Sequence, residues 1–277
     1  MSKKDNIILI QELKEKNKQI NIQKSFTLVN EDLKRMAQEL FSQALFMSDK
    51  NNAYNKAIEA YEIFPSEYQY KTFAISKLSS VDEKEYEFKN LIDEIEKNIM
   101  NSLEGLFEFY DYDEIYSQRF KELKYKYIIT LIINKKYQDA LKELLSFNER
   151  YSYLEFKTKH LVLNLCLALG KKEMFISEYN SISGRENILY LLPFSLLLFK
   201  NNQIEASQKE INRINKLNHH LKDIMVKLDD IDVKKEIECC SSRYYMTTKE
   251  EVLFSLKYFD EYYNDEEYKK LFFSEKE

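Results

Sequence analysis

The sequence predicts an all-α protein, and three observations support that prediction. The 277 residues include only three glycines and two prolines, whereas sandwiches, barrels and doubly wound sheets need such turn-forming residues at most of their connections. Tyrosine occurs 21 times and phenylalanine 18 times, so the chain has enough apolar surface to fold. Alanines also recur at helical spacing.

The clearest helix lies in residues 51–65, NNAYNKAIEAYEIFP. Ala53, Ala57 and Ala60 are spaced i, i+4, i+7, so they share one face and let a second helix approach closely. Pro65 is expected to end this helix. Closer to the N-terminus, Asn30 is followed by two acidic residues, a pattern that predicts the start of another helix.

A polar turn followed by an amphipathic helix recurs at residues 51–65, 134–148, 170–184 and 201–215, and an apolar helix precedes each of these segments. Ala140 and Ala206 are 66 residues apart, or two periods of 33, with Gly170 near the middle. Two helices per period predict stacked helical hairpins. The longer interval from Ala53 to Ala140 predicts a long helix and a break at Gly105 within residues 91–120.

The apolar segment of residues 188–199, ILYLLPFSLLLF, is shorter than the roughly 20 residues that span a bilayer and is predicted to be a buried helix. Near the C-terminus, Thr247 or Thr248 followed by Glu250 and Glu251 resembles a helix start. The apolar stripe that follows consists of Val252, Leu253, Leu256, Phe259, Tyr263 and Leu271.

This pattern resembles tetratricopeptide repeats. Counted from Lys34, the small and apolar motif positions fall on Ala37, Leu40, Phe41, Ala44, Ala53, Ala57 and Ala60, with Pro65 at the closing position. A second unit counted from Lys121 includes Ala140, Leu144 and Phe147, and two more divergent units begin at Phe156 and Asn187. The C-terminal part is similar to the closing segment of some bacterial repeat proteins of unassigned role.

The resemblance implies a TPR-like right-handed α-solenoid of about five helical hairpins over residues 31–220. A basic N-terminal helix or connector (1–30) would precede it, and a C-terminal helical cap with an acidic aromatic tail (221–277) would close it. A generic two-helix array and a plain helical bundle stay open as alternatives.

The first helix of each tetratricopeptide hairpin lines a concave groove. Carried over residue by residue, the resemblance implies a partner-binding groove formed by Tyr125, Ile129, Lys157, His160, Asn164, Leu191 and Ser195. The dicarboxylate clamp of chaperone-binding members is only half matched. His160 and Asn164 fit part of it, but Leu192 stands where a second asparagine is required. An apolar helix or an extended peptide is therefore the expected ligand. Ordinary packing between helices explains the same residues equally well.

The sequence contains none of the phosphate-binding, zinc-protease, nucleophile-elbow or EF-hand motifs. Arg213 precedes His219 by six residues, which resembles the Arg-x(4–6)-His signature of HEPN-type ribonucleases, although a solvated turn explains it too. Cys239 and Cys240 diverge on a helix and lack a second Cys/His pair at zinc spacing. We therefore expect no catalytic activity, cofactor or metal.

The formal net charge of −5 gives no general attraction to nucleic acid or anionic lipid. The three cysteines lack the spaced pairs of a disulfide framework, and the N-terminal apolar run is too short for a signal peptide. The sequence thus predicts a cytoplasmic, non-catalytic scaffold that binds a protein or peptide, without nucleic acid or membrane partners. A peptide-responsive regulator that acts on another protein is the alternative.

Overall fold

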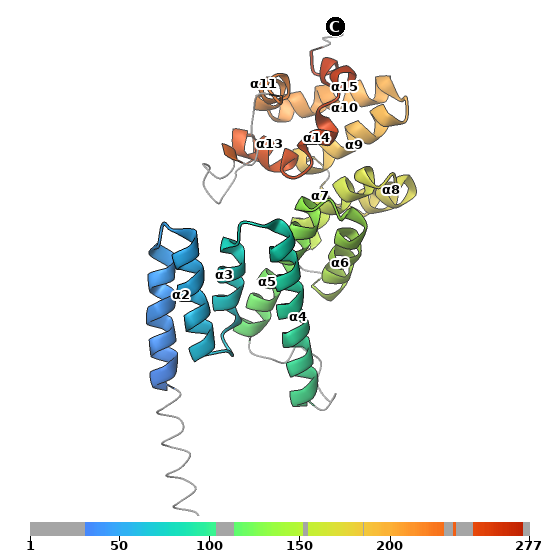
Figure 1. Cartoon of the computed structure of the whole chain (residues 1–277). Coiled ribbons are helices and arrows are strands. Elements are labelled where there is room, and N and C mark those ends of the chain that lie inside the picture. The colour runs from blue at the N-terminus through green and yellow to red at the C-terminus, as the bar shows by residue number, and fades with distance from the viewer. Residues whose placement is uncertain are drawn as a thin grey trace, which may run out of the picture. The chain divides into compact units, whose positions relative to one another are not determined.

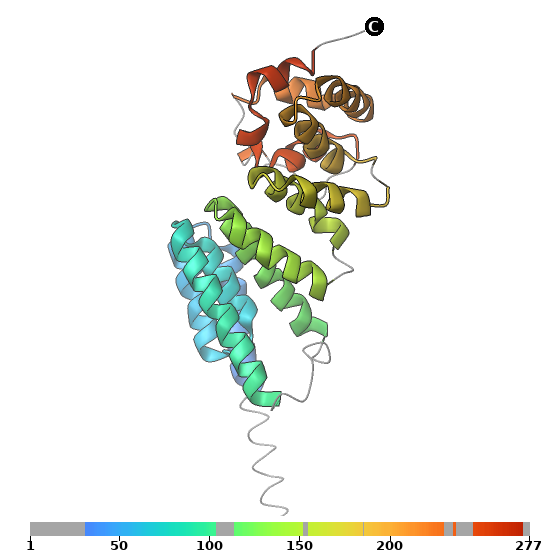
Figure 2. The same ribbon diagram turned by 90° about the vertical axis from the view of Figure 1, so that its right-hand side faces the viewer.

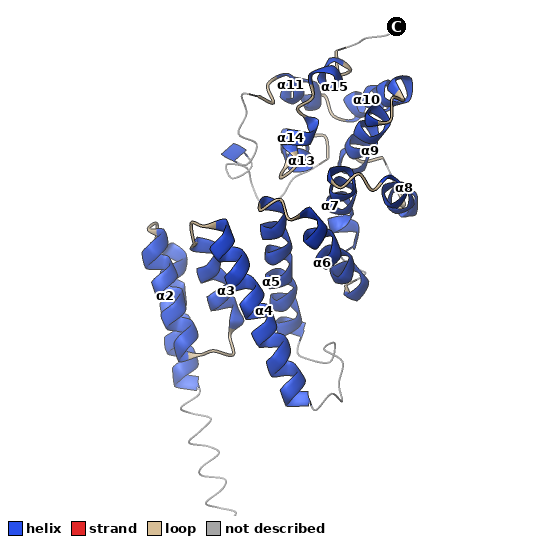
Figure 3. Cartoon of the chain, turned by 45° about the vertical axis from the view of Figure 1, so that its right-hand side comes forward, coloured by secondary structure: helices blue, strands red, loops and turns tan. Residues whose placement is uncertain are grey.

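The structure is a computed structural model that describes residues 31–103, 114–151, 155–184, 186–229, 235–236 and 246–273. All regular elements in these ranges are helices, which confirms the all-α prediction (Figure 3). The predictions for residues 1–30, Gly105, Cys239 and Cys240 lie outside the described residues. After a first helix at residues 31–46, the elements are α2 (Lys50–Ile63), α3 (Tyr68–Lys77), α4 (Val81–Leu103), α5 (Glu114–Ile133), α6 (Tyr137–Arg150), α7 (Glu155–Ala168), α8 (Lys172–Ser181), α9 (Ile188–Lys200), α10 (Ile204–Leu217), α11 (His220–Val226), α13 (Lys249–Leu256), α14 (Asp260–Tyr263) and α15 (Glu266–Lys270).

The chain forms two compact units, Met1–Tyr127 and Ile128–Glu277. In the first unit, α2 packs on α3 and α3 on α4 (Figure 1). Its core joins small alanines to aromatic rings and consists of Ala37, Phe41, Ala44, Ala57, Ala60, Tyr70 and Ala74. Small side chains here allow the helices to approach closely, as predicted. Helix α2 ends at Ile63, before Pro65. Helix α4 is long, with 23 residues, but it begins ten residues before the range in which the long helix was predicted.

In the second unit, helices that follow one another in the chain pack together. Helix α7 packs on α6, α8 and α9, and α9 packs on α10. Helix α13 then returns to contact α9 and α11. Seen from the side, α6 and α7 lie next to each other and the red C-terminal helices lie beside the helices of residues 188–226 (Figure 2). The C-terminal part of the chain is therefore packed along earlier helices of its own unit.

The same turn ends α5, α7 and α9. Lys135, Gly170 and Asn202 have φ angles of 58°, 65° and 57°, in the left-handed region. The residue after each turn residue donates its N–H to a carbonyl five residues earlier, and the turn residue itself donates to one three residues earlier. These are the two hydrogen bonds of a Schellman motif. In all three cases the next helix begins two residues after the turn residue, at Tyr137, Lys172 and Ile204.

These turns also correct the predicted alignment of the repeats. Five residues after each turn residue lie Ala140, Phe175 and Ser207, and all three have 0% exposure. Ala206, which the sequence pattern paired with Ala140, is exposed. The error is one residue, because the two intervals between the turn residues total 67 residues rather than the predicted 66. From the positions of the turn residues, the intervals are 35 and then 32 residues.

Helix α9 is buried along most of its length, as predicted, and Pro193 lies inside it without ending it. Ser195, two residues later, donates to the Leu192 carbonyl at 2.8 Å. Among the described residues, no helix combines the length and apolar character needed to cross a membrane.

The C-terminal segment, defined as residues 246–273, differs in part from its prediction. Thr248 caps α13 by accepting a hydrogen bond from the Glu251 N–H, as expected. The helix that begins there is short and is followed by two further short helices, because the chain turns at Tyr258, whose φ is 72°, and again before Asp265. The predicted apolar stripe is buried except for Leu271, which is partly exposed.

Candidate functional site

The strongest candidate site is the surface of α7 and α9 on which the C-terminal segment rests. We call it the tyrosine-docking face and define it by His160, Asn164 and Ser195. The Tyr263 hydroxyl donates to Asn164 Oδ1 at 2.6 Å. Asn164 Nδ2 in turn donates to the His160 carbonyl at 2.9 Å, which fixes the direction of the amide. Tyr263 and Asn164 are both buried, with exposures of 0% and 2%.

A second tyrosine reaches α9. Tyr268 and Ser195 join their hydroxyl oxygens at 2.7 Å. Because a serine hydroxyl has one proton and Ser195 gives it to the Leu192 carbonyl, Tyr268 is the donor in this pair. The Tyr268 ring packs against Phe199 and Phe272, with both centroid distances at 5.3 Å. Tyr268 therefore combines apolar ring contacts with one specific hydrogen bond.

Burial keeps these two hydroxyls protonated. It raises the pKa of Tyr263 well above its ordinary value, and it also raises the pKa of Tyr268. A neutral Tyr263 phenol can donate to Asn164 Oδ1, whereas a buried phenolate would lose that hydrogen bond and carry a charge that burial disfavours.

Charged groups also hold the segment. Glu261 Oε2 accepts from Lys135 Nζ at 2.6 Å, and Glu261 Oε1 accepts from the Tyr137 hydroxyl at 3.0 Å. Further along, Lys269 Nζ donates to Asp229 Oδ2 at 2.7 Å. That hydrogen bond lowers the pKa of Asp229, so its carboxylate stays ionised around neutral pH.

The start of α13 is fixed by a buried polar cluster. Glu251 Oε2 accepts from the Thr247 N–H at 2.8 Å and from Asn218 Nδ2 at 2.9 Å. Asn218 Nδ2 also donates to the Thr248 carbonyl at 2.9 Å. Asn218 and Glu251 are almost fully buried, so these hydrogen bonds satisfy groups that water cannot reach.

The structure brings together three of the predicted partner-binding residues, His160, Asn164 and Ser195. His160 packs against the Phe254 ring at a centroid distance of 5.4 Å. These three face the chain's own C-terminal segment in the structure. Leu191 is buried in α9, and Ile129 is half-buried in α5.

The two remaining predicted residues are Tyr125 and Lys157. Tyr125 belongs to the first unit. Lys157 lies in α7, but its side chain is outside the described part of the chain. Sequence reasoning also missed Tyr268, Asn218 and Glu261. The signal that could have found Glu261 and Tyr268 is the spacing of one acid and two tyrosines in the acidic tail.

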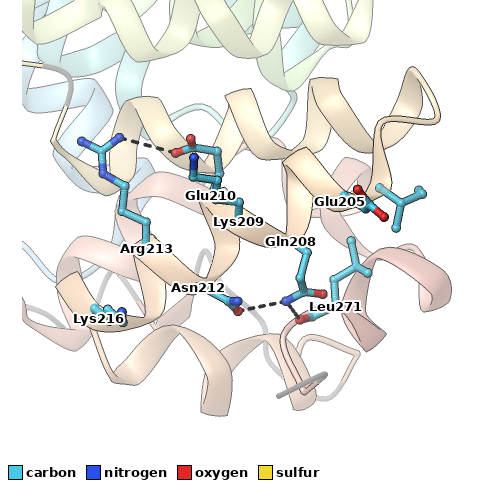
Figure 4. Close-up of a pocket in the computed structure, with 9 residues that line it drawn as sticks. Glu205, Gln208, Lys209, Glu210, Asn212, Arg213, Lys216 and Leu271 are labelled. Atoms are coloured by element: carbon cyan, nitrogen blue, oxygen red, sulfur yellow. Dashed lines mark hydrogen bonds and ion pairs between the residues drawn. The ribbon is translucent and has the colours of Figure 1, made fainter. Parts of the chain in front are cut away.

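A second feature is an open pocket of about 870 Å³ between α10 and Leu271 (Figure 4). Gln208 crosses it, donating to Asn212 Oδ1 at 3.0 Å and to the Leu271 carbonyl at 2.7 Å. Arg213 at its edge is paired with Glu186 and Glu210. The guanidinium of the ribonuclease-like pattern is thus held by two carboxylates, and His219 packs on His220.

Among the described residues, no group of three or more His, Cys, Asp or Glu side chains could hold a metal ion. Burial raises the pKa of the Cys166 thiol to about 12, so it is protonated at neutral pH. Comparison with protein-family models, curated proteins and solved structures gave no significant match.

Proposed function

We propose that this chain is a non-catalytic scaffold that binds a protein or peptide on the tyrosine-docking face. The observation that supports this most strongly is the docked C-terminal segment: two tyrosines of one chain segment are held by single side chains of two different helices. A surface that holds a segment through its side chains in this way is suited to peptide recognition.

The proposal includes a TPR-like solenoid for the second unit. Its support is the recurrence of one turn geometry at Lys135, Gly170 and Asn202, each followed five residues later by a fully buried side chain. A repeated helix–turn–helix unit stacked in a row buries a continuous core and presents equivalent helices on one side. Helices α7 and α9 are such equivalent helices, and they pack on each other.

A capture experiment with matched variants tests this function. Full-length Y263F/Y268F and N164A/S195A proteins both lose the two hydrogen bonds of the segment, but only N164A/S195A alters the face. We expect a stoichiometric protein partner to bind the Tyr-to-Phe variant at least as well as the wild type, and to bind N164A/S195A less. Equal capture by all three proteins would place the partner elsewhere and contradict the proposal.

A further inference from the structure

The C-terminal segment is held by contacts with earlier helices more than by its own structure. Its helices α13, α14 and α15 have eight, four and five residues, and helices this short are unstable alone in water. Two non-glycine residues bordering α13 have left-handed backbones, with φ at 72° for both Thr247 and Tyr258. For a β-branched and for a bulky aromatic residue this conformation is strained.

The face itself needs an occupant. Asn164 and Ser195 are almost fully buried under the segment, and Asn164 Oδ1 receives its hydrogen bond from Tyr263. Without a ligand, the apolar surface around them would be exposed. A replacement ligand must therefore supply the same groups: an apolar surface, two hydroxyl donors and an acid for Lys135 and Tyr137.

We infer that the C-terminal segment is a resident ligand, and that the partner is a short helical segment of the same chemistry that replaces it. The pattern read from the resident segment is Phe-x-Glu-x-Tyr-x4-Tyr, from Phe259, Glu261, Tyr263 and Tyr268. The aromatic residues fill the buried positions, the hydroxyls meet Asn164 and Ser195, and the acid meets Lys135. Strain at Thr247 and Tyr258 is released when the segment leaves. This inference rests on the proposed function.

The test uses a fluorescent peptide of residues 257–273 and two full-length proteins, wild type and Y263A/Y268A. In Y263A/Y268A the resident segment loses both anchors while the face stays unchanged. We expect the peptide to bind this variant at least about tenfold more tightly than it binds the wild type, measured by anisotropy. A control peptide with phenylalanine at both tyrosine positions is expected to bind about tenfold more weakly than the native peptide.

Hydrogen exchange of the wild type provides a test that does not depend on the variant folding. Amides of α13 to α15 are expected to exchange through an opening that leaves α7 and α9 protected. If the amides of all these helices exchanged only when the whole protein unfolds, the inference would be overturned. So would the absence of peptide binding to a variant that circular dichroism shows to be folded.

Two further outcomes separate this inference from the proposed function. A wild-type dimer that exchanges its C-terminal segments, detected by light scattering and by mixing tagged copies, would make a second copy the occupant and overturn the inference. A captured partner that is lost in N164A/S195A but does not compete with the peptide would also overturn it, while leaving the scaffold function supported.

Discussion

Asn164 and Ser195 respond differently when the tyrosine that donates a hydrogen bond to each of them is replaced. In Y263F, Asn164 Oδ1 is left buried without its donor, so we expect a loss of about 2 kcal/mol in the free energy of unfolding. In Y268F, Ser195 still donates to the Leu192 carbonyl, and the expected loss is about 1 kcal/mol. Urea denaturation measures both values. The matched control is Y86F, because Tyr86 is 67% exposed and its change should be within about 0.5 kcal/mol.

The same two tyrosines predict a loss of stability at alkaline pH. Their pKa values are raised by burial, above about 10 in the unfolded chain. Their contribution is therefore fully present below about pH 10 and is lost as the pH rises above it. Each adds a slope of up to about 1.4 kcal/mol per pH unit.

Urea denaturation at several pH values from about 9 to 11.5, with tyrosine ionisation followed by absorbance, checks this dependence. The decline in the free energy of unfolding should be shallower in Y263F/Y268F than in the wild type. A slope that is unchanged in this variant would show that other groups cause the alkaline loss.

At the scale of elements, the three Schellman turns predict opposite effects of two substitutions. In G170A, a side chain must adopt a left-handed backbone although nothing crowds the new Cβ, so we expect destabilisation by about 1 kcal/mol. In N202G, a residue that tolerates this conformation is replaced by the preferred one, and a gain of a few tenths of a kcal/mol is expected, about 0.3. Thermal or urea denaturation measures both. Destabilisation by N202G would contradict the common role of the two positions.

Local pattern was enough to predict most elements. The scarcity of turn formers indicated helices, and alanines at 53, 57 and 60 located the packed face of α2, because both features depend on residues close in sequence. The repeat alignment failed at Ala206 because turn spacing is set by the packing of each hairpin, which a fixed period does not capture. The break at Tyr258 was missed because a tyrosine, rather than a glycine, has the left-handed backbone there.

At the scale of the whole molecule, the docking of the C-terminal segment on α7 and α9 could not be predicted from the sequence. The Tyr263–Asn164 hydrogen bond joins residues 99 positions apart, and helical periodicity gives no information about such pairs. The predicted groove residues His160, Asn164 and Ser195 do share a face. However, the last helices of the chain were expected to close the end of the array, and they lie along α7 and α9 as well.

This arrangement predicts the effect of removing the segment. A chain that ends at residue 245 lacks several fully buried apolar side chains, among them Val252, Leu256 and Phe259. We expect it to lose more than about 3 kcal/mol of stability and to bind the dye 8-anilinonaphthalene-1-sulfonate through the exposed face of α9. A synthetic peptide of residues 246–273, added in trans, should reduce the dye fluorescence and raise the urea midpoint, whereas a peptide with alanine at both tyrosine positions should not. If the shortened chain kept the full-length urea midpoint and bound no dye, the segment would not contribute to the core, and the docked arrangement would be wrong.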